Sequence, residues 1–357
     1  MSRREFIQAA ATAASVVGVG AAASSGATVP AKPHTVRRGV ATYSYQEEFF
    51  VRQMSAEDIL REVSDIGAYG FELIAEMMVP DFPNPSDAWV HQWHGWMEQY
   101  KIIPAAYTQF IDSMRTKKHN LTLDEGVETM MRDIKLAKRL GIPKVRALIG
   151  TPVDVLEATL PHLEKHDIWL GVELHAPIRI DGKLMHRLLQ ISEKSEHFGF
   201  VPDFGIFQNK PNPYARDHMI RQGVLTRDAA LYIENEWENR VPQAKVQEAV
   251  AKMSGGAAAG GYVGQVYGIT TQNPRDLLPF MKKCRHIHGK TWGLDENYVD
   301  PAIDLSEVIP TLIAGGYDGI IATEYEGQRH VQDVQPFSAV EMVRRHHVMM
   351  RRLLGEV

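Results

Sequence analysis

Short apolar segments alternate with longer amphipathic ones along the chain from residue 37 onward. Eight of the apolar segments have the length and character of buried strands. They span residues 38–43, 70–75, 102–107, 145–149, 169–173, 199–203, 286–288 and 319–324. Amphipathic segments at 55–66, 122–140 and 304–314 begin with Ser, Thr or Asp and end just before a strand, which is typical of helices. The alternation predicts an α/β fold.

Eight strands in such an alternation predict a closed (β/α)8 TIM barrel. The alternative is an open, doubly wound sheet. That fold normally binds a dinucleotide through Gly-x-Gly-x-x-Gly after its first strand, whereas here the first strand runs into Tyr43, Ser44 and Tyr45. We therefore expect the barrel.

The stretch between Asp203 and His288 is roughly twice as long as one helix and one loop require. It contains helix-like segments at 226–240 and 242–253, followed by a glycine- and alanine-rich segment at 254–268. We expect an insertion of about residues 206–268 after the sixth strand, on the face where barrels carry their chemistry. It is a candidate lid with a flexible glycine segment, and a partner-binding or purely structural insertion is the alternative. The glycines concerned are Gly255, Gly256, Gly260 and Gly261.

Composition narrows the class of protein. Of 357 residues, 44% are hydrophobic and 23% charged, the balance of a soluble globular chain. A net charge of −5 offers no basic face for nucleic acid. Cys284 is the single cysteine, so any metal must be held by oxygen and nitrogen.

The amino terminus has the pattern of an export signal. Ser2 to Ile7 match the twin-arginine motif, and the apolar stretch from Ala9 to Ala23 is shorter than the ~20 residues of a membrane-spanning helix. We expect a twin-arginine signal peptide over residues 1–31 and a barrel over 32–357, exported to the periplasm or the extracellular space without a membrane attachment after cleavage. An amphipathic helix or a membrane anchor is the alternative.

Four strand-like segments in the second half end in residues that can bind a hard cation. They are Glu173, Asp203, His288 and Glu324, at the expected ends of strands five to eight. Singly, each is explained as a helix cap or a salt-bridge partner. Jointly, they would lie around one opening of the barrel, within reach of one ion. Three carboxylates and one imidazole favour Mn²⁺ or Mg²⁺, with Co²⁺ and Zn²⁺ as alternatives.

These segments carry a family resemblance. Val-Glu-Leu-His at 172–175, Val-Pro-Asp at 201–203, Ile-His-Gly-Lys at 287–290 and Thr-Glu-Tyr-Glu-Gly at 323–327 resemble the xylose isomerase-like TIM barrels, the superfamily of sugar phosphate isomerases and epimerases. The resemblance covers residue 37 to the end. It implies that the four candidate ligands hold one divalent ion, with Mn²⁺ expected. It also implies that the ion binds adjacent sugar oxygens and stabilises an enediolate.

Within the superfamily, Glu-x-His at 173–175 and Glu-Tyr-Glu-Gly at 324–327 most resemble the metal-binding alpha subunit of C-glycoside deglycosidases. That resemblance implies a glycoside already oxidised to a ketone at its 3-position, from which the aglycone is eliminated. The expected partner is therefore a small sugar or glycoside. Homo-oligomers and hetero-oligomers with a small second subunit both stay open.

Three residues are candidates for the chemistry. His175 lies two positions beyond Glu173, so an extended strand would direct both side chains to the inner face, and His175 is the first choice for the base. Lys290 either stabilises an oxyanion or is a surface cation. Glu326 is a possible second acid or base.

Other residues receive weaker interpretations. His286 either supports a metal ligand or is itself an alternative ligand. Glu72 and Glu76, on the second strand, are explained as well by salt bridges as by a role in the site. Near-helical spacing predicts core positions for the tryptophans of residues 89–96 and surface positions for the histidines between them. The stripe consists of Trp89, His91, Trp93, His94 and Trp96.

Two positions depart from the resemblance. Ketose 3-epimerases of the superfamily place a histidine where this chain has Ile206, which disfavours a two-base epimerase. Thr291 and Trp292 replace an acidic residue after His-x-Lys, and Trp292 is expected either to stack on a sugar or aromatic aglycone or to be buried.

The chain is thus expected to be a metal-dependent enzyme that removes a proton beside a carbonyl of a sugar or 3-keto glycoside, with elimination favoured. A sugar isomerase or epimerase of the same fold is the alternative. A non-catalytic carbohydrate-binding partner of an oxidoreductase is another. An endonuclease of a related barrel is disfavoured by the acidic balance, by the expected export and by the shortage of a three-metal histidine set.

Overall fold

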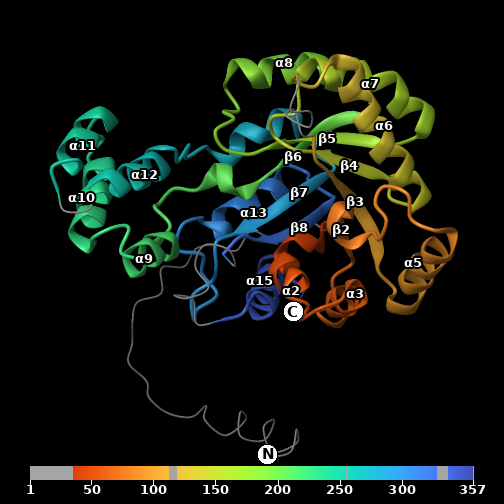
Figure 1. The fold of residues 1–357 in the computed structure, drawn as a ribbon, viewed down its shortest axis with the longest axis horizontal. Coiled ribbons are helices and arrows are strands. Elements are labelled where there is room, and N and C mark those ends of the chain that lie inside the picture. The colour runs from red at the N-terminus through yellow and green to blue at the C-terminus, as the bar shows by residue number, and fades with distance from the viewer. Residues whose placement is uncertain (1–34, 112–118, 254–255, 328–336, 357) are drawn as a thin grey trace, which may run out of the picture. The chain divides into compact units, whose positions relative to one another are not determined.

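Eight parallel strands form one sheet in the order β6-β5-β4-β3-β2-β1-β8-β7 (Figure 1). The computed structural model describes residues 35–111, 119–253, 256–327 and 337–356. The strands are β1 (Arg37–Ala41), β2 (Gly70–Ile74), β3 (Ile103–Gln109), β4 (Lys144–Ala147), β5 (Trp169–Leu174), β6 (Phe198–Pro202), β7 (His286–Thr291) and β8 (Ile320–Tyr325). All eight predicted strands are present, with boundaries shifted by a few residues at most.

Pairing of the first and last strands closes the sheet. Gly39 of β1 lies opposite Gly70 of β2 on one side and Ala322 of β8 on the other. Between β6 and β7, two isolated bridges join Phe200 to Cys284 and Asp203 to His288. The predicted (β/α)8 barrel is confirmed, and the alternative open sheet is wrong.

Helices separate the strands, and several begin at the predicted caps. Ser55 and Thr122 each form a capping box, with Asp58 and Glu125 respectively. The longer helices between strands are α3 (Ala56–Asp65), α5 (Asp87–Tyr100), α6 (Leu123–Arg139), α7 (Val153–His166), α8 (Lys183–Ser192), α13 (Leu305–Ala314) and α15 (Ala339–Leu353). The short ones are η1 (Thr42–Tyr45), α2 (Gln46–Phe50), α4 (Ala75–Met78), η2 (Phe204–Phe207) and η3 (Pro274–Lys283).

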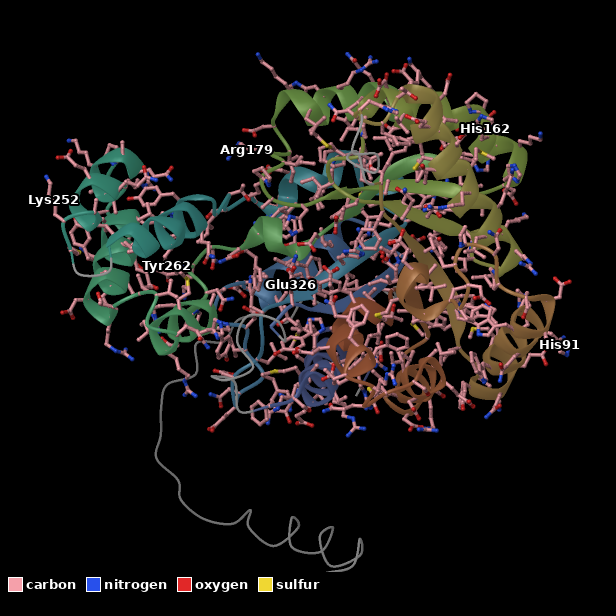
Figure 2. The ribbon with its side chains drawn as sticks, viewed as in Figure 1. His91, His162, Arg179, Lys252, Tyr262 and Glu326 are labelled. Atoms are coloured by element: carbon pink, nitrogen blue, oxygen red, sulfur yellow. The ribbon has the colours of Figure 1, made fainter. Side chains whose placement is uncertain are left out.

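The apolar faces of these helices pack against the strands. Trp93 is fully buried and donates its indole N–H to the carbonyl oxygen of Leu140, at 3.0 Å. Trp96 is also buried, while His91 lies exposed on the outer side of α5 (Figure 2). The tryptophan stripe is therefore part of the core, as predicted.

Between β6 and β7 the chain forms four further helices with a core of their own. They are α9 (Pro213–Arg221), α10 (Arg227–Glu238), α11 (Gln243–Val250) and α12 (Gly256–Tyr267). Their buried cluster is separate from the barrel core and consists of Leu225, Ala229, Ala230, Ile233, Val246, Val250, Ala259, Tyr262, Val263 and Val266. Figure 1 shows α10, α11 and α12 packed together.

The predicted glycine segment is helical where the structure describes it, and its flexibility stays a prediction. Gly256 begins α12, and Gly260 and Gly261 lie inside it, whereas Gly255 falls outside the described residues. Glycine disfavours a helix by about 1 kcal/mol per residue relative to alanine. Burial of Tyr262 and Val263 against α10 and α11 outweighs this preference.

Two features concern the membrane and the leader. Among the described residues, none of the helices combines the length and the apolar character that crossing a membrane requires. The predicted signal peptide, residues 1–31, lies outside the described residues, so export stays a prediction.

The seam between β6 and β7 yields a testable prediction. A Cβ on Gly199 would overlap the carbonyl oxygen of Lys283 and approach the Trp169 ring to 2.9 Å. Gly199→Ala should therefore lower the free energy of unfolding by about 3 kcal/mol. Gly95→Ala is the matched control, because a Cβ there meets nothing within 4 Å and alanine favours the α5 helix by up to about 1 kcal/mol. Urea denaturation of both variants tests this, and equal stability of the two would contradict the packing described.

Candidate metal centre

The four predicted ligands converge at the carboxyl ends of the strands. Glu173 lies near the end of β5, Asp203 directly follows β6, His288 lies within β7 and Glu324 near the end of β8. All four side chains are buried. One ligand atom from each lies within 4.8 Å of the ligand atoms of the other three.

His288 lies at the centre of the cluster. Its Nδ1 is 3.0 Å from Glu173 Oε1, 3.3 Å from Glu324 Oε2 and 3.8 Å from Asp203 Oδ2. Within the described part of the chain, His288 Nδ1, Asp203 Oδ2 and Glu324 Oε2 are buried without a hydrogen-bond partner. Leaving such atoms unpaired costs roughly 1–3 kcal/mol each. A shared cation would satisfy all three, so the donor set fits a divalent ion.

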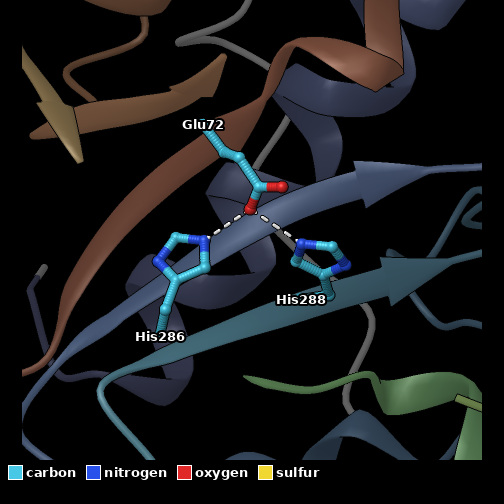
Figure 3. Close-up of side chains that lie close together, drawn as sticks. All are labelled: Glu72, His286 and His288. Atoms are coloured by element: carbon cyan, nitrogen blue, oxygen red, sulfur yellow. Dashed lines mark hydrogen bonds and ion pairs between the residues drawn. The ribbon is translucent and has the colours of Figure 1, made fainter. Parts of the chain in front are cut away.

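Glu72 orients His288 from the opposite side of the ring. Glu72 Oε2 lies 2.7 Å from Nε2 of both His288 and His286 (Figure 3). An ionised carboxylate only accepts hydrogen bonds, so both imidazoles donate from Nε2. In neutral His288 the lone pair is then on Nδ1, facing the three acidic ligands. A carboxylate behind a histidine is the usual support of a metal ligand.

The second oxygen of Glu72 is also fully bonded. Thr108 Oγ1 donates to Glu72 Oε1 at 2.5 Å, and Arg146 Nε lies 3.3 Å from the same atom. Arg146 Nη1 also lies 3.4 Å from Glu173 Oε2. Burial alone would raise the pKa of Glu173, but Arg146 and then His288 outweigh it and lower this pKa to about 2. Glu173 is therefore an ionised ligand.

Arg146 was not among the predicted site residues. It is 3% exposed within the short strand β4, where its guanidinium reaches two carboxylates. A charged residue inside the predicted strand 145–149, which is otherwise apolar, was the available signal. Tyr43, which follows β1, was missed as well, and its hydroxyl donates to Glu326 Oε1 at 3.1 Å.

The cluster carries an excess of negative charge. Four buried carboxylates, those of Glu72, Glu173, Asp203 and Glu324, face two buried permanent cations, Arg146 and Lys290. Lys290 is also shared with Glu326, 2.6 Å away, so even with His288 neutral the carboxylates outnumber the cations, and this excess of negative charge favours a bound cation.

The same excess of negative charge shifts the pKa values of the cluster. Burial, reinforced by the charges of Glu324 and Glu173, raises the pKa of Asp203 to about 7 despite the opposing cation Lys290. Burial alone would lower the pKa of His288, but the surrounding carboxylates, Glu324 first, raise it well above its usual value. A proton and a cation therefore compete for His288 Nδ1.

Lys290 connects the other two candidate catalytic residues, His175 and Glu326. Its Nζ lies 2.9 Å from His175 Nε2, 2.6 Å from Glu326 Oε2 and 3.4 Å from Asp203 Oδ2. Lys290 is 2% exposed, so the alternative of a surface cation is wrong. Glu326 is less deeply buried, with its side chain 20% exposed at the mouth (Figure 2).

His175 is held in one tautomer. Its Nδ1 lies 2.7 Å from the carbonyl oxygen of Ala176, which can only accept, so Nδ1 carries the hydrogen. Nε2 then accepts from the ammonium of Lys290. In this arrangement Nε2 of His175 carries the lone pair and is directed into the site, the position that a general base needs.

The weaker candidates separate clearly. His286 contacts Glu72 and is not a member of the four-residue cluster, whereas Glu76 lies at the surface, 3.7 Å from Arg132. Ile206 is fully buried in η2. Trp292 is half-buried and donates its indole N–H to Gln208 Oε1 at 3.2 Å.

A cavity of about 510 Å³ adjoins the cluster. His175, Gly205, Gln208 and Trp292 line it from the barrel, and α9 and α12 line it from the helical segment. A volume in the range of ~300–1,000 Å³ is typical of small-molecule sites. The barrel mouth therefore combines a fit for a divalent ion, a neutral imidazole and space for an organic ligand.

Residues 60–346 match the sequence model of the xylose isomerase-like TIM barrel, and the chain belongs to that family. The 3'-dehydrocarminate deglycosidase alpha subunit of Microbacterium sp. is 29% identical over 345 residues, covering 90% of this chain and 96% of the relative. A C-glycoside deglycosidase alpha subunit of Arthrobacter globiformis is 26% identical over 335 residues, covering 90% and 93% respectively. These relatives confirm the predicted resemblance and the prediction of an enzyme.

Solved structures agree on the fold. A sugar phosphate isomerase/epimerase from Parabacteroides distasonis has a TM-score of 0.55 at 11% identity, covering 92% of this chain and 98% of the other. An L-ribulose 3-epimerase has a TM-score of 0.52 at 13% identity, covering 90% and 95%. At such identities the likeness shows the architecture alone.

The carboxylate behind His288 can be tested directly. Glu72→Gln removes the charge that holds two imidazole donors, so Mn²⁺ affinity should fall by about 10–100-fold. Calorimetric titration with Mn²⁺ measures this change. Glu76→Gln, on the same segment but at the surface, should bind Mn²⁺ as the unaltered protein does. Unchanged affinity in Glu72→Gln would show that Glu72 does not orient a ligand.

Proposed function

We propose that the chain is the catalytic subunit of a divalent-metal-dependent deglycosidase that acts on 3-keto glycosides by elimination. The observation that carries this proposal is the position of neutral His175 beside a buried cluster of four ligand atoms and at the edge of a cavity. Further support comes from the relatives, of which one is named for a 3'-dehydro substrate and both are named deglycosidase alpha subunits.

Glu173, Asp203, His288 and Glu324 would hold the ion. The oxygen-rich set with one imidazole and an excess of negative charge suits a hard divalent cation, and Mn²⁺ is the ion proposed. When bound, such an ion supplies positive charge beside the sugar oxygens and so stabilises the negative charge of an enolate.

The elimination begins with proton removal. In a 3-keto sugar the carbonyl acidifies the C2 proton, and His175 Nε2 takes that proton. The C2–H electron pair is delocalised onto the C3 oxygen as an enolate. As the enolate collapses, a C1–C2 double bond forms and the C3 carbonyl is restored. The bond from C1 to the aglycone breaks with its electron pair, and the aglycone takes up a proton.

Lys290 has two functions in this scheme. Its ammonium holds the imidazole of His175 neutral and in position through the 2.9 Å contact at Nε2. When the substrate C–H takes that place, the same ammonium is free to donate to the developing oxyanion. Glu326, at 2.6 Å from Nζ and itself bonded to Tyr43, keeps Lys290 at the mouth of the site.

A two-base epimerase is less well supported. Ile206, where related epimerases carry a histidine, is a fully buried aliphatic residue and cannot exchange protons. The solved epimerases share only the fold at 8–13% identity. Isoleucine at this position favours elimination over a two-base inversion.

Two further parts of the proposal concern the setting of the enzyme. The relatives' designation as alpha subunits supports a second subunit for this chain. The Ser2–Ile7 motif supports export by the twin-arginine route, which carries folded proteins. Export of a folded chain suits an enzyme that takes up its ion before leaving the cytoplasm.

Deuterium exchange distinguishes the possible reactions. The Mn²⁺-loaded protein, isolated with any subunit that co-purifies, is incubated with a 3-keto-glucoside in heavy water. Elimination predicts aglycone release, and His175→Asn should lower it by about 100-fold or more because the base is lost, while Mn²⁺ binding persists. Mass spectrometry and aglycone absorbance follow the reaction. Deuterium uptake with inversion and without aglycone release would indicate an epimerase. If neither aglycone release nor deuterium uptake is observed, the chain is a binding protein.

A further inference from the structure

The cavity beside the cluster has two unlike sides. The barrel side presents His175, Gln208 and Trp292. The opposite side comes from α9, α12 and the three residues that follow α12. Its aliphatic side chains are Ala215, Met219, Val266 and Ile269.

This difference in polarity indicates which side of the cavity would bind the sugar and which would bind the aglycone. A sugar carries hydroxyl groups around its ring, and each buried hydroxyl needs a hydrogen-bond partner. On the barrel side, His175 and Gln208 provide such partners, whereas the aliphatic side chains of the helical side do not. The helical side therefore suits a largely apolar group, with polar groups on His218, Gln265 and Thr270 for the few polar substituents it carries.

The helical side is also fixed in shape. Glu234 of α10 accepts from Arg216 Nη1 of α9 at 3.2 Å and from the hydroxyl of Tyr262 of α12, so one carboxylate joins the two lining helices (Figure 2 shows Tyr262). The buried cluster of α10, α11 and α12 holds them further. A rigid wall discriminates between ligands by size, which a loose flap would not do.

We propose that α9 and α12 select the aglycone, accepting an apolar group attached to the sugar and setting its size, while the barrel binds the sugar. This inference rests on the proposed function and adds to it a specificity surface outside the barrel. Ala215 and Met219 of α9, both half-buried, are the positions that set the depth of the pocket.

Ala215→Trp tests the proposal by filling the cavity. Steady-state kinetics compare p-nitrophenyl 3-keto-glucoside, with a large apolar aglycone, and methyl 3-keto-glucoside, with a small one. The variant should raise KM for the first by about tenfold or more and leave the second within about twofold. Ala244→Trp is the matched control, because Ala244 is exposed on α11 and does not line the cavity. It should leave both substrates unchanged.

A binding measurement separates this inference from the proposed function. Fluorescence titration with 4-methylumbelliferone, a flat phenol without a sugar, requires no turnover. If Ala215→Trp abolishes the binding of 4-methylumbelliferone and Ala244→Trp preserves it, the aglycone site is supported even if no 3-keto glycoside reacts. If both substrates are turned over and Ala215→Trp changes KM equally for the two, the proposed deglycosidase activity is retained and the inference about the aglycone is overturned.

Met219→Ala guards against misfolding of the tryptophan variant. Shortening this side chain enlarges the cavity and should improve the ratio of kcat/KM for substrates with larger aglycones, with circular dichroism unchanged. An unchanged ratio in Met219→Ala, together with unchanged 4-methylumbelliferone binding in Ala215→Trp, would overturn the inference.

Discussion

The mouth of the barrel depends on one imidazole that faces carboxylates on both sides. His288 donates from Nε2 to Glu72 and presents Nδ1 to Glu173, Asp203 and Glu324. Burying carboxylates costs several kcal/mol per ion unless each is compensated. Arg146 and Lys290 compensate only part of this charge, because Lys290 is shared with Glu326, so a divalent ion at Nδ1 would relieve the excess that remains.

The strands place ligands and chemistry in two successive layers. Because side chains two positions apart in a strand share a face, three of the four candidate ligands are followed toward the mouth by a group that can act on a substrate. These pairs are Glu173 with His175, His288 with Lys290, and Glu324 with Glu326. Contacts of Lys290 with both His175 and Glu326 show that the outer groups form one connected set. The helical segment α9–α12 then adds an apolar wall beyond them.

Hydrophobic periodicity and the residues at strand ends were enough to predict the barrel and its ligand set. All eight strands and the meeting of the four ligands are found, because parallel strands of a barrel end around one opening. Arg146 was not predicted, since its partners lie on other strands and only the fold brings them together. The helical state of Gly260 and Gly261 was also missed, because packing within α10–α12 overrides glycine's local preference.

Metal binding by paired variants tests the account most directly. The unaltered protein should bind a single Mn²⁺ ion in calorimetric titration. Glu326→Gln, altered in the outer layer, should retain that binding, whereas Glu324→Gln, altered two positions away in the inner layer, should weaken it by about 100-fold or more. Equal Mn²⁺ affinity in the two variants would contradict the assignment of the buried cluster as the metal centre.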